Sequence, residues 1–135
     1  MQYLAIDPGD KRTGLAVGDD RTGIVSPAGV IETSKPAQRL LMIERAITEH
    51  RPDELVLGLA LNMDASEGPG AKKARQLAQQ ITERTGLPIH LVDERLTSEL
   101  ADQWMSGSSL THKAKKKRRD ALAAMAILKR FLEQA

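Results

Sequence analysis

The sequence contains no cysteine, and only three of its 135 residues are aromatic: Tyr3, Trp104 and Phe131. Without cysteine, disulfides and thiolate metal sites are excluded. With so few aromatic rings, the chain lacks the stacking platforms on which single-strand binders hold bases. No run approaches the ~18 apolar residues of a membrane helix, and no signal-peptide pattern is visible. We therefore expect a cytoplasmic protein without membrane contact.

A net charge of +2 hides an uneven distribution along the chain. Residues 113–135 hold 8 Lys or Arg and 2 Asp or Glu, whereas residues 1–112 hold 12 and 16. Such segregation suggests a polyanionic partner, although a basic run can also be a solvated helix face. The run consists of Lys113, Lys115, Lys116, Lys117, Arg118 and Arg119.

Apolar runs and helical periodicity predict one α/β domain over residues 1–135, a length that can bury a core. Strands are expected at 2–7, 12–18, 25–32, 54–59 and 89–92, and the third, which contains Pro27, should lie at an edge. Helices are expected at 36–50, 71–84, 98–105 and 113–133, with loops at 60–70 and 107–109. Three hairpin-type strands followed by crossover units imply a mixed five-stranded sheet flanked by helices.

Acidic residues follow two of the expected buried strands. Asp7 ends the first strand, and Asp93 and Glu94 come directly after the fifth. Open α/β sheets place their sites at these strand ends. In the last helix, Asp120 shares a stripe with Ala124, Ile127 and Phe131, so it should face the sheet. The alternative is that Asp120 only caps that helix.

Carboxylates gathered at a sheet edge are typical ligands of hard cations such as Mg²⁺. Two such ions about 4 Å apart can hold the attacking and leaving oxygens of a phosphoryl transfer. Spacing alone does not establish that the acids converge, so the metal site is a hypothesis at this point.

Four segments occur in an order that resembles the YqgF (RuvX) family of RNase H-like nucleases, over essentially the whole chain. They are Ile6-Asp7-Pro8-Gly9 with Arg12-Thr13-Gly14, Val56-Leu57-Gly58-Leu59 with Asn62-Met63-Asp64, Val92-Asp93-Glu94-Arg95-Leu96-Thr97-Ser98, and Asp120-Ala121-Leu122-Ala123-Ala124. Two positions depart from the family pattern: Ala60 stands where proline is usual, and Ala65 where glycine is usual.

The resemblance implies an RNase H-like fold and a hydrolase that cleaves phosphodiester bonds with Mg²⁺ or Mn²⁺. Asp7, Glu94 and Asp120 match the family's acidic positions, with Asp93 as the alternative to Glu94 and as a group that could orient Arg95. Lys11, Arg12, Asn62 and the basic run are candidate contacts to nucleic acid, although Lys11, Arg12 and Asn62 could simply be turn residues.

Members of this family are described as nucleases that process the 5′ end of pre-16S ribosomal RNA, and also as Holliday junction resolvases. The resemblance therefore predicts cleavage of structured RNA, with branched DNA as the alternative substrate. A resolvase must act on opposed strands and would be a homodimer, so monomer and homodimer both stay open. Two further alternatives are a non-catalytic RNA-binding factor and one lobe of an actin-like ATPase, which would need a second lobe.

Overall fold

A computed structural model of the chain describes residues 1–62, 64, 66–96 and 112–134, with the backbone alone at residues 96 and 112–119. The short helix expected at residues 98–105, the break at residues 107–109 and Ala65 lie outside the described residues. The elements are β1 (Gln2–Asp7), β2 (Arg12–Asp19), β3 (Val25–Glu32), α1 (Pro36–His50), β4 (Glu54–Leu59), α2 (Pro69–Thr85), β5 (Ile89–Asp93), the 3₁₀ turn η1 (Glu94–Leu96) and α4 (His112–Gln134).

The five strands form one mixed sheet in the order β3-β2-β1-β4-β5. β1 and β3 both pair antiparallel with β2, whereas β1 with β4 and β4 with β5 are parallel. The expected mixed sheet is confirmed. β3, which contains Pro27, lies at an edge as expected, since proline cannot donate to a second ladder. β1 occupies the centre, so Asp7 stands at the carboxyl end of the middle strand.

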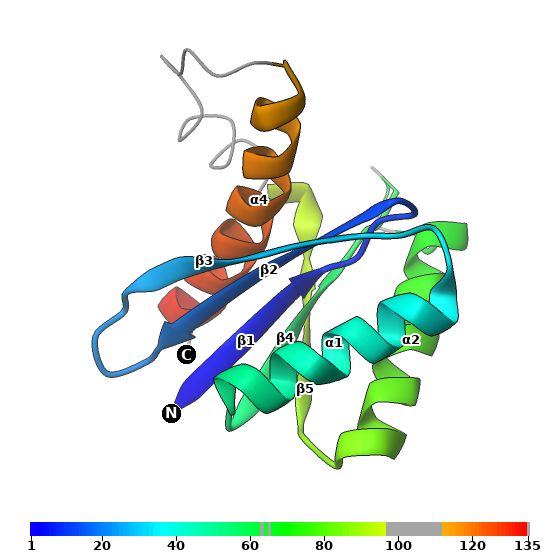
Figure 1. Cartoon of the computed structure of the whole chain (residues 1–135). Coiled ribbons are helices and arrows are strands. Elements are labelled where there is room, and N and C mark those ends of the chain that lie inside the picture. Colours follow the sequence, from blue (N-terminus) through cyan, green and yellow to red (C-terminus); the bar gives the residue numbers. More distant parts are fainter. Residues whose placement is uncertain (63, 65, 97–111, 135) are drawn as a thin grey trace.

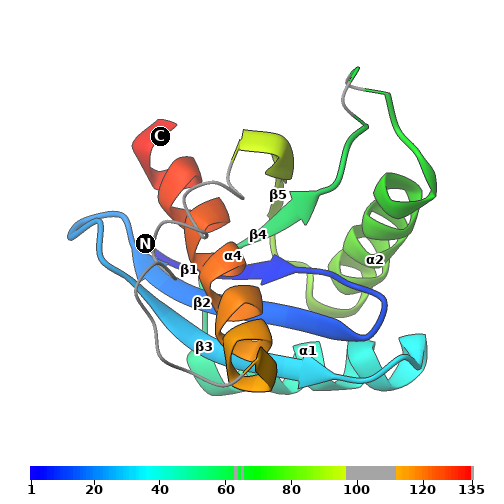
Figure 2. The same cartoon turned by 90° about the horizontal axis from the view of Figure 1, so that it is seen from above.

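Helices cover both faces of the sheet: α4 lies on one face, and α1 with α2 lies on the other (Figure 1). Seen from above, α4 passes in front of the strands and α1 lies behind them (Figure 2). The alternation of β1 explains this division. Leu4 and Ile6 pack into the core beneath α1 and α2, and Tyr3 and Ala5 pack beneath α4. Asp7 continues the second series and therefore lies on the α4 face.

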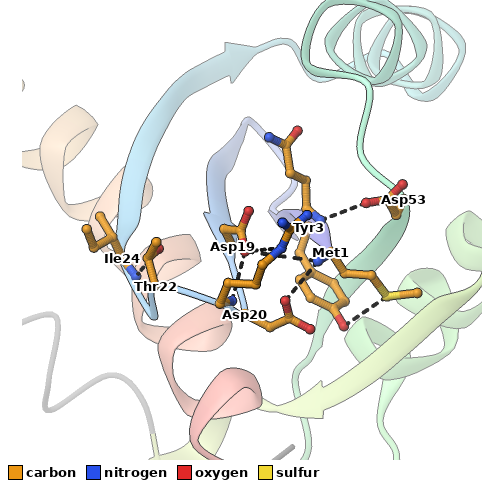
Figure 3. Close-up of polar contacts among 9 residues, drawn as sticks. Met1, Tyr3, Asp19, Asp20, Thr22, Ile24 and Asp53 are labelled. Carbon is orange, nitrogen blue, oxygen red and sulfur yellow. Dashed lines mark hydrogen bonds and ion pairs between the residues drawn. The ribbon is translucent and has the colours of Figure 1, made fainter.

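The opposite end of the sheet, at the start of β1, is held by polar contacts (Figure 3). The Met1 amine lies 2.8 Å from Asp20 Oδ1, and the Gln2 amide donates to Asp53 at 2.8 Å. A cavity of about 390 Å³, lined in part by Tyr3 and His50, lies at this end. It is therefore remote from Asp7 along the length of β1.

Several predicted boundaries were wrong by one or two residues. α2 begins at Pro69 and ends at Thr85, not at residues 71 and 84, because proline is well suited to a first helical turn whose N–H has no partner. β2 extends to Asp19 and β5 to Asp93. α4 begins at His112 and ends at Gln134. The loop after β4 is correspondingly shorter than expected.

Candidate active site

Two of the predicted acids meet directly at the carboxyl ends of the parallel strands. Asp7 is the last residue of β1, and Glu94 begins the 3₁₀ turn that follows β5. Their carboxyl groups share a hydrogen bond, and the negative charge of Asp120 also acts on Asp7. The structure therefore brings Asp7 and Glu94 into contact from distant segments of the chain, with Asp120 near enough for its charge to act on Asp7.

The environment of Asp7 favours its protonated form. Burial, the hydrogen bond with Glu94 and the charges of Glu94 and Asp120 raise the pKa of Asp7 from its ordinary value of 3.8 to about 9. At neutral pH Asp7 thus keeps its proton and donates a hydrogen bond to Glu94. A like-charged pair held this closely shares one proton unless a cation replaces it.

Two glycines make room for this approach. Gly14 lies opposite Asp7 on β2, and Gly58 follows Leu57, the partner of Ile6 on β4. A Cβ at Gly14 would collide with the backbone carbonyl of Asp120, and one at Gly58 would collide with the Glu94 carboxyl. The central acid is thus flanked on both neighbouring strands by residues without side chains. From the sequence alone, neither glycine is assigned a role.

Asp120 is held by Arg12 rather than by the other acids. The Arg12 Nε lies 2.6 Å from Asp120 Oδ2, between residues 108 positions apart. Among the described residues, no group of three His, Cys, Asp or Glu side chains is placed to hold a metal ion as it stands. The proton on Asp7 and the guanidinium of Arg12 supply the positive charge that balances these carboxylates.

Asp93 binds Arg95, whereas Glu94 contacts Asp7. Arg95 donates to Asp93 from Nη2 at 2.7 Å, from Nε at 2.9 and 3.1 Å, and from its backbone amide at 2.9 Å. These hydrogen bonds lower the pKa of Asp93. Asp93 therefore fixes the position of Arg95, and Glu94 is the acid of this motif that reaches Asp7.

The remaining candidate residues are placed less closely. The Asn62 side chain donates to Ser66 Oγ at 3.0 Å, and Ser66 Oγ donates to Asp64 Oδ1 at 2.6 Å, so these residues stabilise their own loop. Lys11 is exposed beside the β1–β2 turn. The basic run from Lys113 to Arg119 lies on the helical backbone that leads to Asp120, but its side chains are outside the described residues.

The raised pKa of Asp7 predicts how stability depends on pH in the metal-free protein. Because the folded pKa lies above the ordinary value, the contribution of this group is full below about pH 4 and is lost as pH rises through about 9. In EDTA, the free energy of unfolding of the wild type should fall relative to that of Asp7→Asn between about pH 5 and 9. Urea titrations of both proteins at several pH values measure the difference, and parallel curves would contradict the assignment.

The fold itself is one found in junction-resolving enzymes. A structure of T. thermophilus RuvC with a Holliday junction substrate matches with a TM-score of 0.62 and 15% identity, covering 99% of this chain and 94% of that one. The fowlpox virus resolvase with junction DNA matches with a TM-score of 0.64 and 12% identity, covering 99% and 98%. At these identities the likeness establishes the architecture, a RuvC-like RNase H fold.

The family is established by sequence. The family model described as "RuvX: Holliday junction resolvase" matches residues 1–134. A protein of Chromobacterium violaceum named "Putative pre-16S rRNA nuclease" is 39% identical over 132 residues, which covers 97% of this chain and 96% of that protein. The chain belongs to the RuvX family, and the resemblance read from its four motifs is confirmed.

Proposed function

We propose that this chain is a metal-dependent endonuclease that hydrolyses phosphodiester bonds of structured RNA and processes the 5′ end of pre-16S rRNA. The observation that carries this proposal is the meeting of Asp7 with Glu94 at the strand ends, with the charge of Asp120 acting on the same carboxyl. Such crowding of acids is costly unless a cation or proton offsets it. The name of the Chromobacterium violaceum relative supports the choice of RNA.

The residues fit a divalent cation. Their donors are carboxylate oxygens, which Mg²⁺ and Mn²⁺ prefer, and a cation would replace the proton that Asp7 now keeps. Asp7, Glu94 and Asp120 would hold it, whereas Asp93 is committed to Arg95. When bound, such a cation polarises a phosphoryl oxygen and makes a water molecule more acidic.

The side chains have distinct tasks in this scheme. Asp7 would have to lose its proton for its carboxylate to hold the cation beside Glu94. If Asp120 also held the cation, the Arg12 guanidinium that it now binds would be available to a phosphate of the substrate. Arginine suits this task because its planar fork matches phosphate oxygens.

The proposal extends to the partner, the domain and the location of the protein. The basic run at the start of α4 binds the phosphate backbone of the RNA next to the acids. Residues 1–135 act as one nuclease domain, and the protein works in the cytoplasm. None of the helices in the described ranges has the length and apolar character to cross a membrane.

Holliday junction resolution is the second candidate, favoured by the description of the matching family model. It uses the same acids but requires two sites acting on opposed strands, so it predicts a homodimer in solution. Sedimentation of the protein alone and with a four-way junction distinguishes this candidate from a monomeric RNA nuclease.

One experiment tests the proposed activity. Pre-16S RNA and a four-way DNA junction are incubated side by side with the wild type, with Mg²⁺ and with EDTA. We expect Mg²⁺-dependent cleavage of the RNA and little cleavage of the junction. Cleavage of the junction alone would favour junction resolution. If the protein binds the RNA but neither cleaves it nor binds Mg²⁺ in calorimetry, it would be a non-catalytic RNA-binding factor.

A further inference from the structure

A basic groove lies on the face of the sheet opposite α4, between the β1–β2 turn, α1 and α2. Its volume is about 490 Å³. The side chains that give it its character are three cations, one acid and two amides, namely Lys11, Arg39, Lys73, Asp10, Gln76 and Gln80. Positive charge therefore exceeds negative charge along this groove.

The groove continues toward the acids. A neighbouring cavity of about 180 Å³ shares Asp10, Arg39 and Lys73 with it and reaches Pro8 and Gly58. Pro8 follows Asp7 directly, and Gly58 is the residue against which the Glu94 carboxyl packs. A polymer that enters the groove can thus extend to the edge of the sheet where the candidate acids lie.

The cation of Arg39 is held in place rather than mobile. Its Nη2 donates to the backbone carbonyl of Asp10 at 2.7 Å and to that of Thr33 at 3.4 Å. Its Nε is buried, and among the described residues no acceptor reaches it. A buried donor without a partner is costly, so this guanidinium is suited to an added acceptor or anion.

The one acid of the groove does little to neutralise it. Asp10 Oδ1 lies 3.5 Å from Lys73 Nζ, and both side chains are largely exposed, at 85% and 70%. Exposed pairs of this kind are weak, which leaves Lys73 available to another anion. None of the described residues that line the groove is aromatic, so its chemistry suits a sugar–phosphate backbone rather than stacked bases.

We propose that this groove is a second binding surface for the substrate, and that Lys11, Arg39 and Lys73 hold phosphates of the strand beyond the scissile bond. The inference rests on the proposed nuclease function and extends it to the face of the sheet that α4 does not cover. The substrate strand then crosses the sheet edge, contacting α4 on one side and the α1–α2 groove on the other.

The test measures binding separately from cleavage. The probe is a fluorescein-labelled RNA hairpin with a single-stranded 5′ extension, and all binding variants carry Asp7→Asn so that the RNA stays intact. Lys73→Gln and Lys11→Gln are compared with Lys72→Gln, an exposed lysine on α2 that lines neither cavity. Anisotropy titrations over a range of salt concentrations give the dissociation constant and its salt dependence.

Each groove variant should weaken binding by about threefold to tenfold at low salt and reduce the slope of log K against log salt by about 0.7. Lys72→Gln should change neither quantity, and Asp10→Asn should tighten binding. If Lys73→Gln and Lys72→Gln weaken binding equally, the proposed groove is wrong. The proposed nuclease function would still stand in that case, provided that the wild type cleaves the same RNA. Failure of the parent protein to bind or cut the RNA would overturn both.

Discussion

Replacing Asp7 by Asn is expected to abolish cleavage and to leave the protein folded. The substitution removes the central carboxylate that Glu94 and Asp120 approach. In the proposed function Asp7 supplies a metal-ligating oxygen, and loss of such an oxygen forfeits several kcal/mol of transition-state stabilisation, or about 10³-fold in rate. Folding should persist because Asp7 is already uncharged at neutral pH, and an amide of the same shape replaces it. Single-turnover cleavage of pre-16S RNA and thermal unfolding by circular dichroism measure the two effects.

Asp93 provides the matched control for this result. Asp93→Asn removes a carboxylate one residue from Glu94, but one that is bonded to Arg95 rather than to Asp7. Its rate should fall far less than that of Glu94→Gln, which removes the partner of Asp7. An Asp7→Asn protein that cuts at the wild-type rate, or an Asp93→Asn protein as inactive as Glu94→Gln, would contradict the assignment of the acids.

Replacing Gly58 by Ala is expected to damage activity much more than stability. The added methyl group would collide with the Glu94 carboxyl and approach the Ile127 side chain within 2.6 Å. Both contacts involve the ends of flexible side chains, so the fold can adjust at a cost of about 1–3 kcal/mol. The adjustment moves Glu94 from Asp7, and a displacement of about 1 Å at a reacting centre can cost about 10²-fold in rate.

Gly70→Ala is the matched control for Gly58→Ala. It makes the same substitution in the first turn of α2, where the atom nearest to a new Cβ is the Cβ of Ala60, at 3.9 Å. Since alanine favours a helix more than glycine does, this protein should be as stable as the wild type or slightly more so. If Gly58→Ala and Gly70→Ala retain equal activity, the close packing of Glu94 on β4 has no functional importance.

Much of the fold was predictable because local signals agreed with the global arrangement. The apolar run of β4 and the periodicity of α1 gave both elements their observed bounds. Pro27 placed β3 at an edge. Helix ends were harder, since at Pro69 the favourable first-turn geometry of proline competes with its role as a helix breaker.

The site was predictable in its residue types but not in its contacts. Strand ends indicated that Asp7 and Glu94 could meet, because parallel strands finish at one edge of a sheet. The Arg12–Asp120 pair depends on how α4 packs against β2, which no local pattern encodes. The roles of Gly14 and Gly58 follow from the close approach of Asp120 and Glu94 to those strands, which no local sequence pattern specifies.

The central position of β1 affects how readily the site unfolds locally and where substitutions can be tolerated. Strands bonded on both sides are among the last parts of a protein to open, whereas loops, turns and sheet margins open readily. Asp7 ends such a strand, and the amide hydrogens of the doubly paired residues before it, Tyr3 to Ile6, should exchange with solvent only on global unfolding. The groove residues Lys11 and Lys73 lie instead on a turn and a helix surface. If the groove binds substrate as proposed, substitutions at these two positions could change the preferred substrate during evolution without lowering the stability of the central strand.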